Sequence, residues 1–269
     1  MLDHLGASID CQPVMVVVAG QSNALGYTLS AADLPPRLAA PTEGAMIWDP
    51  ARRAFADLRP GINTGSPNQP RNWGPEAQFA YRWRAERACA PLYIVKYARG
   101  ETGLALDPLR PDWSTQSRGE LWDKAAAEID AAKAALAAGG LRPSVTAVLW
   151  MQGETDSETP AKAAAYEVNL RAFVAAIRMR WGDKDTVVHI AQIDRPVPAK
   201  RGWDTVRTAQ AAVAASTPGV TLIDTAPFER QPSDGTHLTA QGQVKLGDAF
   251  YEQVRGQPSS FSGVKLITP

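Results

Sequence analysis

The sequence predicts an α/β fold, a three-layer αβα sandwich built on a five-stranded, mainly parallel sheet. Two observations lead to this prediction. Apolar, β-branched runs alternate with segments of helical periodicity along the chain. The runs are also apolar at successive positions, as strands are when helices cover both faces of a parallel sheet. The five runs are residues 14–19, 92–97, 145–151, 186–193 and 220–224.

The segments between these runs carry the start and stop signals of helices. Pro75 and Pro160 each stand at the first position of a predicted helix, where proline is favourable. The apolar stripe at 121–136 stops at Gly139 and Gly140, and glycine terminates helices. The predicted helices cover about residues 75–87, 121–136, 160–181, 203–215 and 239–254.

The whole chain, residues 1–269, is predicted to form a single domain with its core at about 14–256 and a loosely packed tail at 257–269. Apolar residues make up 45% of the chain, which is enough for a substantial core. The stretches 30–75 and 101–118 are predicted to be irregular, apart from a short strand at Ala45–Trp48. Loops of this length inside a compact domain are often functional.

The charge balance argues against nucleic acid as a partner. The chain has 28 Lys and Arg and 28 Asp and Glu, so its formal net charge is zero, whereas phosphate contacts demand a basic surface. The first apolar run is too short for a membrane span, and no basic segment precedes it. We therefore expect a soluble chain with no membrane partner and a cytoplasmic location, with export left open if the sequence has been trimmed. The oligomeric state is not indicated.

Cys11 and Cys89 are the two cysteines of the chain. Neither lies in a CxxC pair, so no zinc or thioredoxin-like site is indicated. Each precedes a predicted strand, which leaves a disulfide between them open. We expect them to be unpaired, because disulfide frameworks are typical of small, cysteine-dense secreted domains.

A serine follows the first apolar run, in the segment Gly20-Gln21-Ser22-Asn23. A serine hydroxyl is a weak nucleophile that needs a base to take its proton. Ser22 could instead cap the helix that follows the run, and the two roles are compatible. The N–H of Ser22 would point into the same space as its hydroxyl and could stabilise an oxyanion.

The segment that contains Asp234 and His237 supplies a base and a partner for it. The chain has three histidines. His4 is near the terminus and His189 lies within a predicted strand, so elimination leaves His237 as the base for Ser22. Asp234 stands three residues earlier on the same loop and could hold the tautomer of the imidazole. The alternative is an exposed turn with no role in chemistry.

Polar residues also begin directly after the third run, with Gln152 and Glu154. In parallel sheets ligands bind beyond the carboxyl ends of the strands, so these residues, Ser22 and Gly100 are predicted to meet at one edge. The side-chain amide of Gln152 could donate to an oxyanion. Glu154 could orient a loop or compete with Asp234 for the histidine. The alternative is that polar residues simply begin where burial ends.

Three ordered segments resemble the SGNH/GDSL hydrolase superfamily, and more narrowly its sialate O-acetylesterase and carbohydrate esterase family 6 branch. They are GQSN at 20–23, WMQGETD at 150–156 and DGTHL at 234–238. Two further stretches are similar to motifs of that branch, GPE at 74–76 and IVKYARG at 94–100. Together these matches run from about residue 14 to residue 246.

The resemblance implies a flavodoxin-like sandwich that hydrolyses acetyl esters on sugars through an acyl-enzyme, without a metal or other cofactor. It implies Ser22 as nucleophile, His237 as base and Asp234 as its partner. The substrate would be a small-molecule or polysaccharide acetyl ester of the acetylxylan or sialate type.

The implied oxyanion hole consists of the Ser22 N–H, a glycine N–H after the second run and Gln152. The sequence Arg99-Gly100-Glu101-Thr102-Gly103 departs from the Gly-Gly-Thr-like pattern expected there, and Gly100 is taken as the donor. Supporting or substrate-contacting roles are expected for Gln21, Asn23, Glu76 and Glu154.

Two other functions stay open. One is a carbohydrate-binding protein without catalysis, because four tryptophans fall in or near loops and could stack on sugars; ordinary packing is expected for at least half of them. The other is a thioesterase or lipase on the same scaffold. No G-x-S-x-G elbow is present, which argues against an α/β-hydrolase. The four tryptophans are Trp48, Trp73, Trp113 and Trp203.

Overall fold

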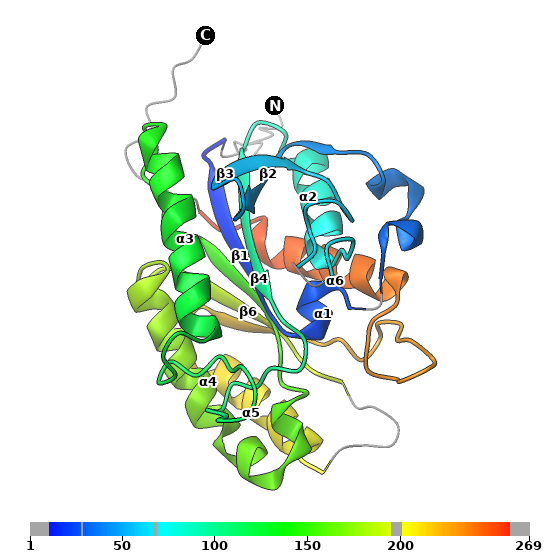
Figure 1. Cartoon of the computed structure of the whole chain (residues 1–269), viewed down its shortest axis with the longest axis vertical. Helices are drawn as coiled ribbons and strands as arrows, with labels where there is room; N and C mark the ends of the chain where they lie inside the picture. The colour runs from blue at the N-terminus through cyan, green and yellow to red at the C-terminus, as the bar shows by residue number, and fades with distance from the viewer. Residues whose placement is uncertain (1–10, 28, 67–68, 195–200, 259–269) are drawn as a thin grey trace, which may run out of the picture.

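The computed structural model describes residues 11–27, 29–66, 69–194 and 201–258, and its centre is a seven-stranded sheet (Figure 1). The strands lie in the order β3-β2-β4-β1-β5-β6-β7. All neighbouring strands are parallel except β2 and β3. The strands are β1 (Val14–Gly20), β2 (Thr42–Asp49), β3 (Ala54–Leu58), β4 (Leu92–Ala98), β5 (Ala147–Met151), β6 (Val187–Ala191) and β7 (Val220–Ile223).

The predicted number of five strands was wrong, because β2 and β3 extend the sheet beyond β4. The sequence predicts only the part of β2 from Ala45 to Trp48, as a short strand. β3 reads Ala-Phe-Ala-Asp-Leu and is largely half-buried or exposed, so it contains no apolar run that the sequence could reveal. Its antiparallel pairing with β2 makes it a strand, and such pairing depends more on context than on propensity.

Helices cover both faces of this sheet (Figure 1). The helices α2 and α6 pack on one face, and α3, α4 and α5 pack on the other. The helices are α1 (Ser22–Leu25), α2 (Pro75–Glu86), α3 (Leu121–Ala138), α4 (Pro160–Arg180), α5 (Trp203–Ser216) and α6 (Ala240–Val254), with short 3₁₀ turns η1 (Ala31–Asp33), η2 (Pro36–Leu38) and η3 (Asp156–Glu158).

Strand β1 shows why the sequence specifies this arrangement. Its side chains alternate between the two cores, with Val16 and Val18 facing α2 and α6 and Met15 and Val17 facing α3, α4 and α5. All four are 0% exposed. A strand that buries both faces needs apolar residues at every position, which is the continuous run seen in the sequence.

The order of the five parallel strands β4-β1-β5-β6-β7 is 2-1-3-4-5 when they are numbered along the chain. This is the flavodoxin-like order, in which ligands bind beyond the carboxyl ends of the strands where the winding reverses. Here that point lies at the end of β1, because β4 is on one side of it and β5 on the other. The turns that follow these three strands therefore meet at one edge of the sheet.

The four tryptophans that might have stacked on sugars are all buried. Trp48 is 4% exposed, Trp203 is 1% exposed, and Trp73 and Trp113 are 0% exposed. Trp48 donates its Nε1–H to Glu128, and Trp73 donates to the carbonyl of Ser30. The interpretation of these residues as sugar platforms was therefore wrong, and all four belong to the packing of the domain.

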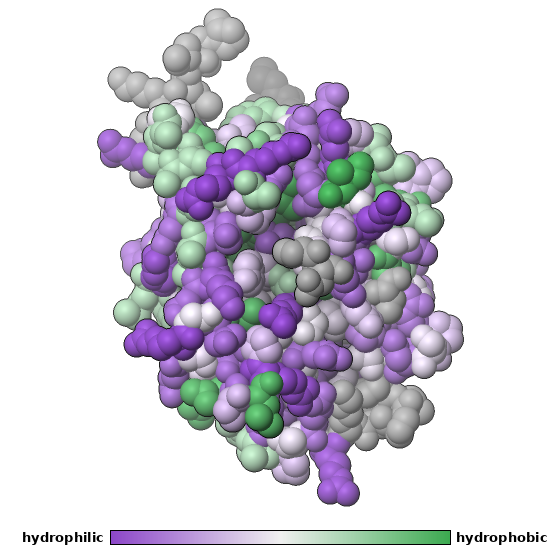
Figure 2. Space-filling model, in the orientation of Figure 1, coloured by the Kyte–Doolittle hydropathy of each residue, from purple (hydrophilic) through white to green (hydrophobic). Residues whose placement is uncertain are grey.

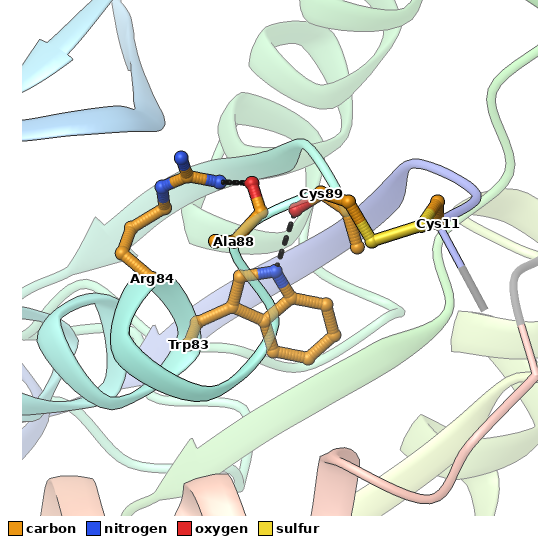
Figure 3. Close-up of a disulfide and its surroundings, with 6 residues drawn as sticks. Cys11, Trp83, Arg84, Ala88 and Cys89 are labelled. Carbon is orange, nitrogen blue, oxygen red and sulfur yellow. Dashed lines mark hydrogen bonds between the residues drawn. A yellow bond between two sulfur atoms is a disulfide. The ribbon is translucent and has the colours of Figure 1, made fainter. Parts of the chain in front are cut away.

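Cys11 and Cys89 form a disulfide, contrary to the expectation that they are unpaired. The bond ties the segment before β1 to the loop between α2 and β4, next to the indole of Trp83 (Figure 3). The sequence could not reveal this pairing, because the two cysteines are 78 residues apart and only the parallel pairing of β1 with β4 brings them together. Disulfides persist in oxidising compartments and are rare in the cytosol.

The face of the molecule seen in Figure 2 is mostly hydrophilic, with hydrophobic residues in small separate groups. Across the described ranges, none of the helices is both long and apolar enough to cross a membrane. The start of the chain, 1–10, and most of the predicted tail, 259–269, lie outside the described residues.

The disulfide should stabilise the fold. A bond that closes a loop of 78 residues should stabilise the fold by about 4.5 kcal/mol through the chain entropy it removes from the unfolded state, and measured values for disulfides are commonly about 2–4 kcal/mol. In urea denaturation the double variant Cys11→Ser/Cys89→Ser should therefore lose about 2–4 kcal/mol of free energy of unfolding. Equal stability of the variant and the oxidised parent would contradict this, and the parent treated with a reductant serves as the control.

A buried histidine should make the fold sensitive to acid. His189 on β6 is 0% exposed and bonds Thr221 through Nδ1 at 2.7 Å, and burial lowers its pKa to about 4. The unfolded chain takes up this proton near pH 6.5 and the folded chain only near pH 4. Stability from this group is therefore present above pH 6.5 and declines as pH falls to about 4, by about 3 kcal/mol in total.

The variant His189→Asn removes this titration and retains a side chain that can bond Thr221. Its free energy of unfolding should fall less than that of the parent between pH 7 and pH 4.5 in urea denaturation. Parallel pH profiles for the two proteins would show that His189 does not carry the effect.

Candidate active site

Ser22 is held at the carboxyl end of β1, where only Gln21 separates the strand from the first residue of α1. The tight passage needs Gly20, which has φ 140° and lies so close to β5 that an added Cβ would stand 2.0 Å from the carbonyl oxygen of Met151. No side chain fits there. Ser22 itself is 5% exposed, so little water reaches this position at the edge of the sheet.

Gly100, in the turn after β4, lies against Ser22. A Cβ added to Gly100 would stand 3.7 Å from the Cβ of Ser22. Within the described residues, neither the N–H of Ser22 nor that of Gly100 has a hydrogen-bond acceptor. Unpaired backbone N–H groups beside a nucleophile are what an oxyanion requires.

Asp234 holds the imidazole of His237 from the same loop. Its Oδ2 lies 2.8 Å from His237 Nδ1, and its Oδ1 accepts the backbone N–H groups of Thr236 and His237, each at 2.8 Å. Partial burial works to raise the pKa of Asp234, but the hydrogen bonds from His237 and Thr236 outweigh it and hold that pKa below its ordinary value. An ionised carboxylate can only accept, so the proton of the neutral imidazole is on Nδ1 and Nε2 is the basic nitrogen.

The side chain of Asn23 ties this loop to the turn after β1. Its Nδ2 donates to the carbonyl of Thr236 at 3.1 Å and to Glu154 Oε1 at 3.0 Å, and its Oδ1 accepts the N–H of Leu238 at 2.9 Å. Gln243 on α6 donates to the carbonyl of Asn23 at 2.9 Å. The residues on either side of His237 are therefore fixed to the residue that follows Ser22.

Tyr27 places the imidazole beside α1. Its ring centroid lies 4.6 Å from that of His237, at an interplanar angle of 48°, and its N–H bonds the carbonyl of Ser22 at 2.9 Å. Across the described residues no hydrogen bond joins the Ser22 hydroxyl to the imidazole, and such bonds often tighten only when substrate is bound. Tyr27 was missed by the sequence analysis, because only its closeness to Ser22 in the chain hints at it.

Glu154 bonds Asn23, and within the described residues it has no hydrogen bond to the histidine. It is 3% exposed, its Oε1 accepts from Asn23, and its Oε2 is buried without a partner in the described part of the chain. Burial raises the pKa of this carboxyl. Of the two carboxylates that could serve the imidazole, Asp234 bonds His237 Nδ1, while Glu154 supports the loop through Asn23.

Gln152 does not have a free N–H for an oxyanion. The residue is 0% exposed, and its Nε2 donates to Asp156 Oδ2 at 2.6 Å and to the carbonyl of Thr102 at 3.0 Å. Its Oε1 accepts from the hydroxyl of Tyr166 at 3.1 Å, which fixes the orientation of the amide. Both N–H groups of the amide are used, so these contacts correct the predicted oxyanion role and make Gln152 a link between two turns.

Gln21 joins the same set of turns from the end of β1. Its Oε1 accepts the N–H groups of Gly153 at 3.4 Å and Thr155 at 3.3 Å, and the Nε2 of Gln152 at 3.4 Å. It is 3% exposed. These hydrogen bonds hold the turn after β5 in place against Gln21, next to Ser22.

Glu76 is too deeply buried to contact substrate, which corrects that part of its expected role. It is 0% exposed, and its Oε1 lies 2.8 Å from Lys96 Nζ and accepts the N–H of Gly74 at 2.8 Å. Lys96 also donates to the carbonyl of Leu25, the last residue of α1, at 2.9 Å. The ion pair therefore supports the short helix that carries Ser22. Burial lowers the pKa of Lys96.

No three His, Cys, Asp or Glu side chains are grouped to hold a metal ion within the described ranges. The turns after β1, β4 and β5 and the loop before α6 thus supply a serine, unpaired N–H groups and an imidazole with its carboxylate.

A flavodoxin-like sheet with these groups at its carboxyl edge defines a class, the carboxylic ester hydrolases of the SGNH type. The chain belongs to the carbohydrate esterase, sialic acid-specific acetylesterase family, whose model matches residues 13–255. Membership of this family makes the protein an ester hydrolase. No curated protein is significantly similar to it in sequence.

Several solved structures share the fold. A protein from Arabidopsis thaliana superposes with a TM-score of 0.71 at 21% identity, over 90% of this chain and 96% of that one. NanS gives a TM-score of 0.65 at 16% identity, over 90% and 96%. A carbohydrate acetylesterase from Xanthomonas citri gives 0.61 at 18% identity, over 90% of this chain and 56% of that one. At these identities the likeness shows the fold.

Breaking the buried ion pair should cost more than removing it. Lys96→Met leaves the Glu76 carboxyl buried without its cation and should lower the free energy of unfolding by roughly 3–5 kcal/mol. The double variant Glu76→Gln/Lys96→Met removes both charges and should lose less. Urea denaturation of the two variants and the parent measures this, and a double variant less stable than Lys96→Met would contradict the argument.

Proposed function

We propose that this enzyme removes acetyl groups from O-acetylated carbohydrate through an acyl-enzyme formed on Ser22. The observation that carries the proposal is the 2.8 Å contact of His237 with Asp234, on a loop that Asn23 fastens to the helix of Ser22. The preference for acetyl esters on sugars is supported by the description of the family to which the chain belongs.

In the proposed reaction the Ser22 hydroxyl attacks the ester carbonyl while His237 Nε2 takes its proton. The tetrahedral oxyanion is stabilised by the N–H groups of Ser22 and Gly100. In the described part of the chain neither N–H donates to another acceptor. The imidazolium, stabilised by ionised Asp234, then protonates the oxygen of the leaving sugar hydroxyl as the carbon–oxygen bond breaks. Water, deprotonated by His237, attacks the acetyl group, releases acetate and regenerates Ser22.

The two competing functions have less support. A carbohydrate-binding protein without catalysis would need exposed aromatic platforms, and the four tryptophans considered for this are buried. A lipase would need an extended apolar surface for its acyl chain, whereas the face in Figure 2 is mostly hydrophilic. The zero net charge and the mostly hydrophilic face seen in Figure 2 also favour a neutral, polar substrate over nucleic acid or membrane.

The disulfide bears on where the enzyme works. We propose a compartment that maintains disulfides, in place of the cytoplasmic location expected from the sequence, because Cys11 and Cys89 are paired. Alkylation of the protein in its native cells before lysis, followed by mass spectrometry, should find both cysteines protected. Quantitative alkylation of both would contradict this.

Removal of the nucleophile should abolish turnover. Ser22→Ala should lower kcat on p-nitrophenyl acetate by on the order of 10⁴-fold or more, and Asp234→Asn by roughly 10⁴-fold, because the imidazole then loses its tautomer. Ser216→Ala, at the exposed end of α5, should retain the parental rate. Hydrolysis by folded Ser22→Ala at the parental rate would refute the proposed mechanism.

The acyl preference can be measured on the parent. On aryl esters whose acyl chains have about two to eight carbons, kcat/KM should fall steeply beyond acetyl. The enzyme should also release acetate from acetylated xylan or from O-acetylated sialic acid. Rates that rise with chain length would favour a lipase or thioesterase.

A further inference from the structure

Asp156 is a buried carboxylate that the proposed mechanism does not use. It is the first residue of η3 and is 0% exposed. Its Oδ1 accepts the N–H of Ala105 at 2.9 Å, and its Oδ2 accepts the N–H of Leu104 at 2.8 Å and the Nε2–H of Gln152 at 2.6 Å. Charge-assisted hydrogen bonds of this kind are about twice as strong as neutral ones. Three N–H donors from two different turns therefore converge on one side chain.

The donors Leu104 and Ala105 belong to the loop that begins with Gly100. The second N–H of Gln152 bonds the carbonyl of Thr102 at 3.0 Å, and the hydroxyl of Thr102 bonds the carbonyl of Arg99 at 2.7 Å. Residues 99–105 are thus attached to the end of β5 through Gln152 and Asp156. The same loop lies against Ser22 at Gly100.

The conformation of this loop needs such an anchor. Glu101, the residue after Gly100, has φ 60°, and a non-glycine residue pays on the order of 1 kcal/mol for the left-handed region. Strain of this kind persists only where the surrounding contacts fix the backbone. Glu101 is exposed, so the fixing contacts come from the residues that follow it, at 102, 104 and 105.

We propose that Asp156 is a positioning residue that sets the Gly100 N–H against the oxyanion, acting through Gln152 and the loop 99–105. The inference rests on the proposed function, because it assumes that Ser22 is the nucleophile. A misplacement of about 1 Å in such a group can cost on the order of 10²-fold in rate. Asp156→Asn keeps the shape of the side chain, but it puts an NH₂ group where donors converge and loses at least one of the three hydrogen bonds.

Asp112 provides a matched control on the same long loop. It is 1% exposed, its Oδ1 accepts from the N–H of Ser114 at 2.9 Å and the hydroxyl of Ser117 at 2.6 Å, and its Oδ2 accepts the N–H of Asp107 at 2.8 Å. Its side chain therefore orders residues 107–117 and bonds none of residues 99–105. The backbone does meet that loop, because Asp112 is bridged to Gly103 and the N–H of Trp113 bonds the carbonyl of Gly103 at 2.8 Å, and Asp112→Asn leaves these backbone contacts in place. Asp112→Asn should cost comparable stability and leave kcat within about threefold of the parent.

The experiment compares these variants in kcat and KM for p-nitrophenyl acetate, in the rate of serine phosphorylation by diethyl p-nitrophenyl phosphate, and in urea denaturation. Asp156→Asn should lower kcat by roughly 10²–10³-fold with KM within about threefold. The phosphorylation rate should fall in parallel, because that reaction also develops negative charge on an oxygen in the oxyanion hole. A purely structural role would change stability and leave both rates of the folded protein intact.

Thr102→Val is a milder second variant of nearly the same shape, for use where Asp156→Asn does not fold. It removes the bond from the Thr102 hydroxyl to the carbonyl of Arg99 and the bond that this hydroxyl accepts from Trp113 Nε1 at 3.2 Å. It should lower kcat by roughly tenfold with KM unchanged. Parental kcat in folded Asp156→Asn, or in Thr102→Val where Asp156→Asn is unfolded, would overturn the proposal. Equal losses of kcat in Asp156→Asn and Asp112→Asn would do the same.

The variant Ser22→Ala separates failure of this proposal from failure of the proposed function. If Ser22→Ala is active, the proposed function itself fails. If Ser22→Ala is inactive and Asp156→Asn is not impaired, only the positioning role of Asp156 fails.

Discussion

The central position of β1 is the constraint on which the rest of the structure depends. The strand is buried on both faces and lies between two parallel neighbours, β4 and β5. Parallel pairing makes all three strands end at the same edge, so the turns that follow them must lie side by side. Gly20 then lets the chain pass against the carbonyl of Met151, which brings Ser22 to that edge. The position of Ser22 is therefore a consequence of how the sheet is wound.

Polar side chains, rather than apolar packing, join the turns at this edge. Asn23 bonds the loop of His237, and Gln21 bonds the turn after β5. Gln152 and Asp156 bond the turn after β4. A buried hydrogen bond costs free energy if one partner is lost, so each of these contacts specifies one arrangement of the turns. The result is a preorganised site, which is what stabilisation of a developing charge requires.

Side-chain contacts that depend on a local spacing were open to prediction from the sequence. The bond between Asp234 and His237 spans three residues of one loop, and the sequence could anticipate it. The role of Gln152 could not be anticipated, because its amide meets Thr102 and Asp156, and Thr102 lies 50 residues away. The same reason hid the ion pair of Glu76 with Lys96 and the disulfide of Cys11 with Cys89.

The sequence by itself determined the alternation of strands and helices and the sheet with two covered faces, because burial on both faces requires continuous apolar runs. It also determined the family to which the chain belongs, because the motifs that identify the family are short and local. Only the tertiary structure decided the edge strand β3, the burial of the four tryptophans and the partners of the polar groups around Ser22. Those features depend on which distant segments become neighbours, and neighbours in space are set by strand order and pairing rather than by any single stretch of residues.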